Sequence, residues 1–112
     1  MKWTLDDTIV AWASAAAPGR RAVIRLSGPQ AIDLATRIFT ASEPIDLSRR
    51  RWYHGEITLR ALDRRVEGGL LVWPPPRTYT GQAMAELHVV SSPPLVEFIV
   101  ADLLQAGARA AR

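Results

Sequence analysis

The chain has 112 residues, 48% of them hydrophobic and 22% charged, a balance that suits one folded domain and excludes wholesale disorder. It contains no cysteine and two histidines, which excludes disulfides and cysteine-ligated metals and leaves too few soft ligands for a zinc site. The formal net charge is +3, and arginines cluster at 49–51 and 64–65. We interpret these clusters as solvated turn charges, with phosphate binding as the alternative.

The N-terminal segment is interpreted as part of the fold. The apolar run 9–17 faintly resembles a signal peptide, but Asp6 and Asp7 precede it, where such a segment carries positive charge. No run approaches the ~20 apolar residues of a membrane span. We therefore expect a soluble, cytoplasmic protein.

The N-terminal half predicts two strands and a helix. Residues 8–14 are a short apolar run, and residues 22–27 (AVIRLS) are rich in β-forming residues, with a Pro-Gly turn between them. Apolar residues then recur at helical spacing over residues 30–39, up to and including Phe39. Residues 40–46 are interpreted as a polar connection.

The middle of the chain predicts a β-hairpin. Alternating residues over 51–59 and 66–73 form its two strands, and residues 62–65 form its tip. Gly68 and Gly69 lie inside the second strand, which indicates a bulge or a close backbone approach.

The last third predicts a strand over 83–90 and a strongly periodic helix over 95–105, with a serine at 91–92 as its cap and Gly107 as its end. The order is β-β-α-β-β-β-α, with room for one further strand after Gly107. It predicts an α+β fold in which a mixed β-sheet carries two helices on one face. We find no internal repeat and no linker, so residues 1–112 should form a single domain.

Several stretches, taken in order, resemble one family. They are DTIVA at 7–11, PGR at 18–20, IRLSGP at 24–29, WPPPRTYTG at 73–81, AELH at 85–88 and LLQAGAR at 103–109. Each is weak alone, but the ordered set covers nearly the whole chain and resembles the N-terminal domain of the MnmE (TrmE) tRNA-modification GTPases. In that family the domain precedes a helical domain that a Ras-like GTPase domain interrupts. The resemblance implies that this chain is the N-terminal domain, truncated near its C-terminal end and without the other two.

The resemblance also implies a function. Family members dimerise through this domain and use it to bind 5-formyl- or 5,10-methylene-tetrahydrofolate, which supplies a one-carbon unit for modification of the wobble uridine of tRNA. The FAD- and NADH-using protein MnmG (GidA) is the partner in this reaction. GTP, Mg²⁺ and K⁺ would belong to the GTPase domain of this enzyme family. This chain has no phosphate-binding loop of the GxxxxGK[ST] type, so we expect it to hydrolyse no GTP by itself.

Two charged residues match the family's folate-binding positions: Arg25, ahead of SGP, and Glu86, after TYTG. A carboxylate can accept two hydrogen bonds from the donor edge of a pterin, while an arginine suits the glutamate tail of folate or, alternatively, the pterin carbonyl or the formyl oxygen. Each residue also lies between apolar neighbours in a predicted strand, where a charge is uncommon unless it is paired or functional. The alternative is that Arg25 and Glu86 pair with each other or point to solvent. Tyr79 either walls a ring-binding pocket or plugs the core. We predict no catalytic and no metal-ligating residue.

Two departures from the family pattern put full folate affinity in doubt. Gln82 and Ala83 stand where the family has an acidic pair, and Val90-Ser91-Ser92 replaces His-Gly-Gly, whose glycines permit close backbone approach. They motivate a second hypothesis, a degenerate dimerisation scaffold without folate binding. A third is a small basic RNA-binding module, which the absence of aromatic residues between basic ones on a strand disfavours. The tryptophans are interpreted as core or dimer-interface residues rather than ligand stackers: Trp3, Trp12, Trp52 and Trp73.

Overall fold

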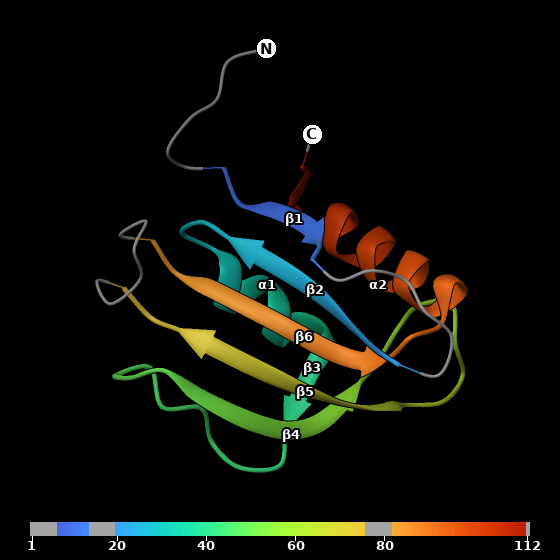
Figure 1. The fold of residues 1–112 in the computed structure, drawn as a ribbon, viewed down its shortest axis with the longest axis horizontal. Helices are drawn as coiled ribbons and strands as arrows, with labels where there is room; N and C mark the ends of the chain where they lie inside the picture. Colours follow the sequence, from blue (N-terminus) through green and yellow to red (C-terminus); the bar gives the residue numbers. More distant parts are fainter. Residues whose placement is uncertain (1–6, 14–19, 76–81, 112) are drawn as a thin grey trace.

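A twisted β-sheet forms the centre of the domain (Figure 1). The computed structural model describes residues 7–13, 20–75 and 82–111. Over these residues the elements are β1 (Ile9–Trp12), β2 (Arg21–Ser27), α1 (Ala31–Ile38), β3 (Phe39–Ala41), β4 (Arg51–Ile57), β5 (Val66–Trp73), β6 (Met84–Val90), α2 (Pro93–Ala106) and β7 (Arg109–Ala110). The strands lie in the order β3-β4-β5-β6-β2-β1-β7, and every neighbouring pair is antiparallel except β1 and β7. The predicted α+β fold with a mixed sheet is confirmed.

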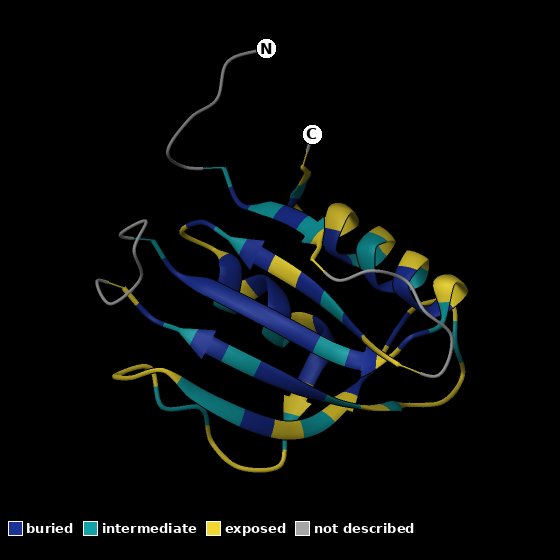
Figure 2. Cartoon of the chain, viewed as in Figure 1, coloured by how far each residue is buried: buried dark blue, intermediate teal, exposed yellow. Residues whose placement is uncertain are grey.

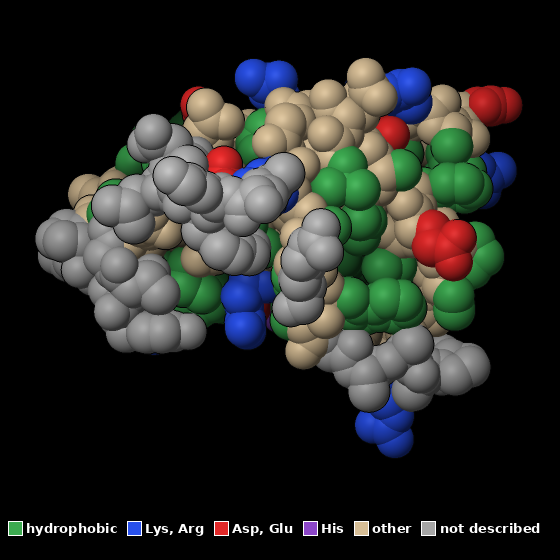
Figure 3. Space-filling view, turned by 90° about the horizontal axis from the view of Figure 1, so that it is seen from above, with side chains coloured by type: hydrophobic (Ala, Val, Ile, Leu, Met, Phe, Trp, Pro, Cys, Tyr) green, Lys and Arg blue, Asp and Glu red, His purple; other side chains and the backbone are tan. Residues whose placement is uncertain are grey.

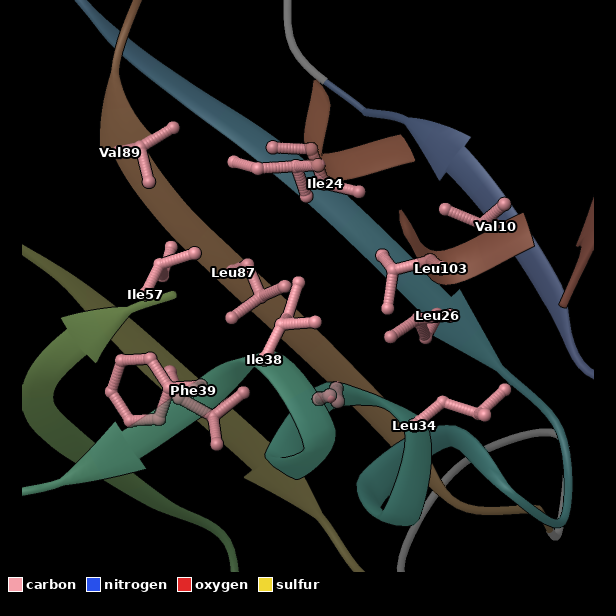
Figure 4. Packing of buried hydrophobic residues seen from close by; sticks show 14 of the residues in the cluster. Val10, Ile24, Leu26, Leu34, Ile38, Phe39, Ile57, Leu87, Val89 and Leu103 are labelled. Atoms are coloured by element: carbon pink, nitrogen blue, oxygen red, sulfur yellow. The ribbon is translucent and has the colours of Figure 1, made fainter. Parts of the chain in front are cut away.

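Both helices pack on the same face of the sheet. Helix α1 contacts β2 and β6, helix α2 contacts β1 and β2, and the two helices contact each other. Strand β2 shows why this face is covered, because its alternate residues Ala22, Ile24 and Leu26 are fully buried. Figure 4 shows Ile24 and Leu26 among the apolar side chains of this layer, together with Leu87 of β6 and Leu103 of α2. The strand alternation turns the intervening residues to the other surface of the sheet.

We call this other surface, which faces away from the helices, the open face. One row of paired residues crosses five strands on it: Ala11 of β1, Arg25 of β2, Glu86 of β6, Leu71 of β5 and Trp52 of β4. Figure 2 shows exposed and intermediate residues alternating with buried ones along β2, whereas β6 is buried over most of its length. The open face therefore carries the predicted site residues on neighbouring central strands.

The prediction that Phe39 extends the first helix is wrong. Helix α1 ends at Ile38, and Phe39 already has extended backbone angles of φ −120° and ψ 130°. It begins β3, whose other two residues, Thr40 and Ala41, fall in the predicted polar connection, and it pairs with Ile57 of β4. Strand β4 offers backbone hydrogen-bond partners to residues 39–41. These hydrogen bonds could not form if the helix continued for another turn. Gly55 of β4 makes room for this, since a Cβ there would meet the Thr40 carbonyl and the Phe39 ring.

The ends of α2 agree with the sequence in part. Ser92 is the N-cap and prolines occupy the first turn, but the serine side chain makes no cap hydrogen bond, so the predicted side-chain capping is not observed. Gly107 ends the helix with φ 123°, a conformation that favours glycine. The strand expected after Gly107 is β7. Of the two described helices, neither combines the length and the apolar character that crossing a membrane requires.

Candidate functional site

Arg25 and Glu86 face each other on the open face. They are paired residues of the antiparallel strands β2 and β6, so their side chains project side by side from the same surface. The Arg25 guanidinium donates two hydrogen bonds to Glu86 Oε2, from Nε at 2.8 Å and from Nη2 at 2.5 Å. The two predicted site residues are thus brought together, and they form the direct pair that was the alternative to a ligand-binding role.

The two partners differ in their access to solvent. Glu86 is 6% exposed although it lies on the open face, whereas the Arg25 side chain is 44% exposed. A carboxylate loses much hydration when it is buried and needs hydrogen-bond donors in compensation. Arg25 is therefore the accessible partner of a carboxylate that is itself nearly covered.

A second donor reaches the same carboxylate from its own strand. His88 lies two residues after Glu86 on β6, and its Nε2 is 3.2 Å from Glu86 Oε1. Because an ionised carboxylate only accepts hydrogen bonds, Nε2 carries the proton and donates. In the neutral imidazole Nδ1 is then an acceptor, and among the described residues this buried atom finds no hydrogen-bond partner.

Trp52 of β4 borders the histidine. The rings of Trp52 and His88 meet edge to face, with centroids 4.9 Å apart. The indole lies over Gly69 of β5, where a Cβ would stand 2.0 Å from its Cζ2 atom. The predicted close approach is confirmed at both glycines, since a Cβ on Gly68 would stand 2.9 Å from the His88 carbonyl oxygen. The continuous register of β4 and β5 contains no bulge.

A hollow of about 520 Å³ opens beside Trp52 and His88 on the open face. Its wall combines charged and aromatic side chains, among them Arg20, Arg21, Trp52, His54, Glu67 and His88. The Arg21 guanidinium lies 5.6 Å from the centre of the Trp52 ring, within the range of a cation–π contact. The open face can therefore offer a polar ligand a carboxylate, guanidinium groups and an aromatic plane close together.

Comparison with known proteins identifies the family of this fold. The family described as "GTP-binding protein TrmE N-terminus" matches residues 8–112. The chain belongs to the TrmE N-terminus family. It is 40% identical over 109 residues to the tRNA modification GTPase MnmE of Rhodopirellula baltica, and 37% identical over 112 residues to that of Xanthomonas campestris pv. campestris (strain 8004). It is 34% identical over 111 residues to MnmE of a Thermus thermophilus strain.

These alignments place the TrmE N-terminal domain within longer proteins. Each covers 96% of this chain but only 23% of the Rhodopirellula and Xanthomonas proteins and 25% of the Thermus protein. The chain thus spans about a quarter of the length of the relatives it matches. The resemblance inferred from ordered motifs, to the N-terminal domain of the MnmE (TrmE) family, is confirmed.

The remaining predicted site features have different outcomes. Tyr79 lies outside the described residues. Ser91, which stands in place of a family glycine, is 5% exposed. Its backbone N–H donates to the Arg20 carbonyl, and its Oγ is buried without a partner in the described part of the chain. Where the tryptophans are described they do not lie in the core, since Trp12 is 37% exposed and Trp52 and Trp73 are half-buried; their interpretation as dimer-interface residues stays a prediction.

His88 and Trp52 are neighbours of the Arg25–Glu86 pair that sequence reasoning missed. The signal for His88 was present, because residues two apart on a strand project from the same face, and Glu86 was already a candidate. No comparable signal existed for Trp52, because its position beside His88 depends on β5 lying between β4 and β6.

Proposed function

We propose that this TrmE N-terminal domain binds a reduced folate on its open face and serves a tRNA-modification GTPase as its folate-binding and dimer-forming module. The observation that carries the proposal is the nearly buried carboxylate of Glu86 on a surface that no helix covers among the described residues. Such a carboxylate is expensive to maintain without partners. A ligand whose ring edge offers two donors suits it well.

The existing hydrogen bonds define how a pterin would fit. An ionised carboxylate offers about four lone-pair sites, and Arg25 uses two of them on Oε2 while His88 uses one on Oε1. A ligand with two donors therefore has to take over at least one position that Arg25 holds. Since the Arg25 side chain is 44% exposed, it can turn toward an acceptor of the ligand, such as a carbonyl or carboxylate oxygen. A bound reduced folate would supply the one-carbon unit for the uridine modification, and the residues of this chain would bind and orient it.

Calorimetric titration with 5-formyltetrahydrofolate tests this proposal. We expect saturable binding that Glu86→Gln weakens by about tenfold to a hundredfold, because the amide presents a donor where the ligand needs an acceptor. Glu43→Gln is the matched control, since Glu43 is an exposed carboxylate between β3 and β4, outside the hollow on the open face. Absence of binding by the wild-type chain, or equal affinity of both variants, contradicts the folate proposal.

Self-association is the second part of the proposed function. Apolar side chains of β1 and α2 surround a groove of about 550 Å³, among them Trp12, Val96, Val100 and Leu104. Trp12 is 37% and Leu104 40% exposed. Figure 3 shows apolar side chains gathered around a hollow on this side of the molecule. Contiguous apolar surface of this kind is typical of protein–protein contacts, and we propose that a second copy of the chain covers it.

Light scattering tests the dimer independently of folate. We expect the mass of a dimer for the wild-type chain and of a monomer for Leu104→Glu, because a charge in the groove would be buried without a partner. Leu47→Glu is the control, since Leu47 is 60% exposed and lies away from the groove. A dimer that folds normally without any folate binding would favour the scaffold hypothesis.

The RNA-binding alternative finds less support. Three arginines of the basic clusters already pair with acidic side chains: Arg49 with Asp46, Arg51 with Glu43 and Arg65 with Glu56. Phosphate binding would have to compete with these ion pairs. We accordingly propose that contact with tRNA and with MnmG, as well as GTP hydrolysis with Mg²⁺ and K⁺, belongs to the complete GTPase and not to the arginine clusters of this domain.

A further inference from the structure

We propose that His88 is a positioning residue for Glu86: it fixes the carboxylate through Oε1 and thereby keeps it oriented for a ligand when Arg25 turns away. This inference rests on the proposed folate-binding function and deepens it. It starts from the 3.2 Å contact between His88 Nε2 and Glu86 Oε1 on adjacent same-face positions of β6.

The distribution of donors over the two carboxylate oxygens gives His88 this role. Both Arg25 hydrogen bonds end on Oε2, and the histidine alone reaches Oε1 among the described residues. When a ligand displaces Arg25, a carboxylate that is 6% exposed would lose its protein donors on that side. An unpaired buried carboxylate is strongly disfavoured. The His88 hydrogen bond remains throughout the exchange, so it holds the carboxylate in place and lowers the free-energy cost of releasing Arg25.

The surroundings of His88 restrict the movement of its ring. The His88 side chain is 14% exposed, and the indole of Trp52 packs edge to face against it at 4.9 Å. Trp52 can occupy this place because Gly69 beneath it has no side chain. Trp52 and Gly69 thus keep the imidazole of His88 directed at Glu86, and three strands contribute to the orientation of one carboxylate.

Which ring nitrogen of His88 carries the proton can be used to test this contact, and the buried Nδ1 atom shows why. It has no partner among the described residues, so the hydrogen bond of the ring to Glu86 is made through Nε2 alone. The contact with Glu86 requires the proton on Nε2. We therefore expect His88 to populate the Nε2–H form, whereas His54 is exposed and has no contact with Glu86 among those described.

The binding test uses three variants and the same titration with 5-formyltetrahydrofolate. We expect His88→Ala to weaken binding about tenfold. His88→Gln should stay within about threefold of wild type, because the glutamine amide can donate a hydrogen bond in place of Nε2–H. Gln105→Ala is the control and should leave the affinity unchanged, because Gln105 is an exposed polar residue of α2, which packs on the face of the sheet opposite to Glu86. The rescue by glutamine separates a hydrogen-bonding role from simple packing.

The outcomes distinguish the two proposals. If the wild-type chain binds no folate, the proposed function fails and the positioning role falls with it. If the wild type binds and Glu86→Gln weakens binding, but His88→Ala binds like wild type or His88→Gln is as weak as His88→Ala, the positioning role alone is overturned.

A ligand-free measurement keeps the inference testable should His88→Ala fail to fold. The chain has two histidines, so ¹⁵N labelling of histidine gives two resolvable imidazoles in the wild-type protein. Nε2–H for His88 in the wild type, with the second tautomer appearing in Glu86→Ala, which has no acceptor at this place, supports the contact. A mixture of both tautomers for His88 in the wild type, as expected for a solvated ring, overturns it.

Discussion

Glu86 and Leu87 are neighbours on β6, and the pleat of the strand turns them to opposite faces of the sheet. Leu87 is 0% and Glu86 6% exposed, so burial hardly separates them. Leu87 is covered by apolar side chains of the core, whereas Glu86 is covered by hydrogen-bond donors from Arg25 and His88. Close packing of apolar side chains stabilises the helix-covered face, whereas hydrogen bonds with defined directions stabilise the open face around Glu86. A ligand cannot replace the side chains that fill the core, but its hydrogen bonds can replace those that Glu86 receives from the protein.

The largest effect is expected where volume is removed from the covered face. Leu87→Ala should lower the free energy of unfolding by about 2–5 kcal/mol, because it leaves a cavity among side chains that cannot fully collapse. Urea denaturation measures this change. Leu47→Ala, at a position 60% exposed, is the control and should stay within about 0.5 kcal/mol. A loss near that of the control would show that the face beneath the helices is not tightly packed.

Adding volume to the open face should have the next largest effect. A methyl group at Gly69 would collide with the Trp52 ring, so Gly69→Ala should cost about 1–3 kcal/mol unless the indole moves aside. The same substitution in a Trp52→Ala background removes the collision. The double-mutant cycle should then show coupling of more than about 1 kcal/mol. Additive effects of the two substitutions would mean that the indole does not rest on Gly69 in solution.

The ion pair provides a comparison between two kinds of open-face contact. Arg25→Ala should cost about 1–3 kcal/mol of stability, since it leaves the covered Glu86 carboxylate with His88 as its remaining described donor. Arg65→Ala removes the ion-pair partner of Glu56, but Arg65 lies just before β5 and both of these side chains are more than half exposed. It should change stability by less than about 0.5 kcal/mol. Equal losses in the two variants would show that water reaches Glu86 as freely as it reaches Glu56.

The sequence predicted the strands and the charged residues on them better than it predicted the strand order and the pairing between strands. Alternation along 22–27 and 83–90 was enough to mark Arg25 and Glu86 as charges in central strands, and the ordered motifs identified the family. The pairing of these residues, 61 positions apart, could not be derived, because strand order and register depend on the whole sheet. Local periodicity places Phe39 in the helix because it contains no information about a strand partner such as Ile57, which lies 18 positions later.

The smallest expected effect concerns an exposed carboxylate in the connection between β3 and β4. The Ser48 hydroxyl, then the Ser48 backbone N–H, and more weakly the charges of Arg49 and Arg51 hold the pKa of Asp46 below its usual value of 3.8. A carboxyl whose pKa is lower in the folded than in the unfolded state stabilises the fold above the unfolded value, and this contribution disappears as the pH falls through the folded one. Asp46→Asn should therefore lower the urea midpoint slightly at neutral pH and have no effect at about pH 2, where both forms of the chain carry a neutral group. If the urea midpoints of the two proteins still differ at acidic pH, the loss of stability comes from the Asp46 hydrogen bonds and not from its charge. Asp46 would then resemble Glu86, whose role depends on the geometry of its hydrogen bonds.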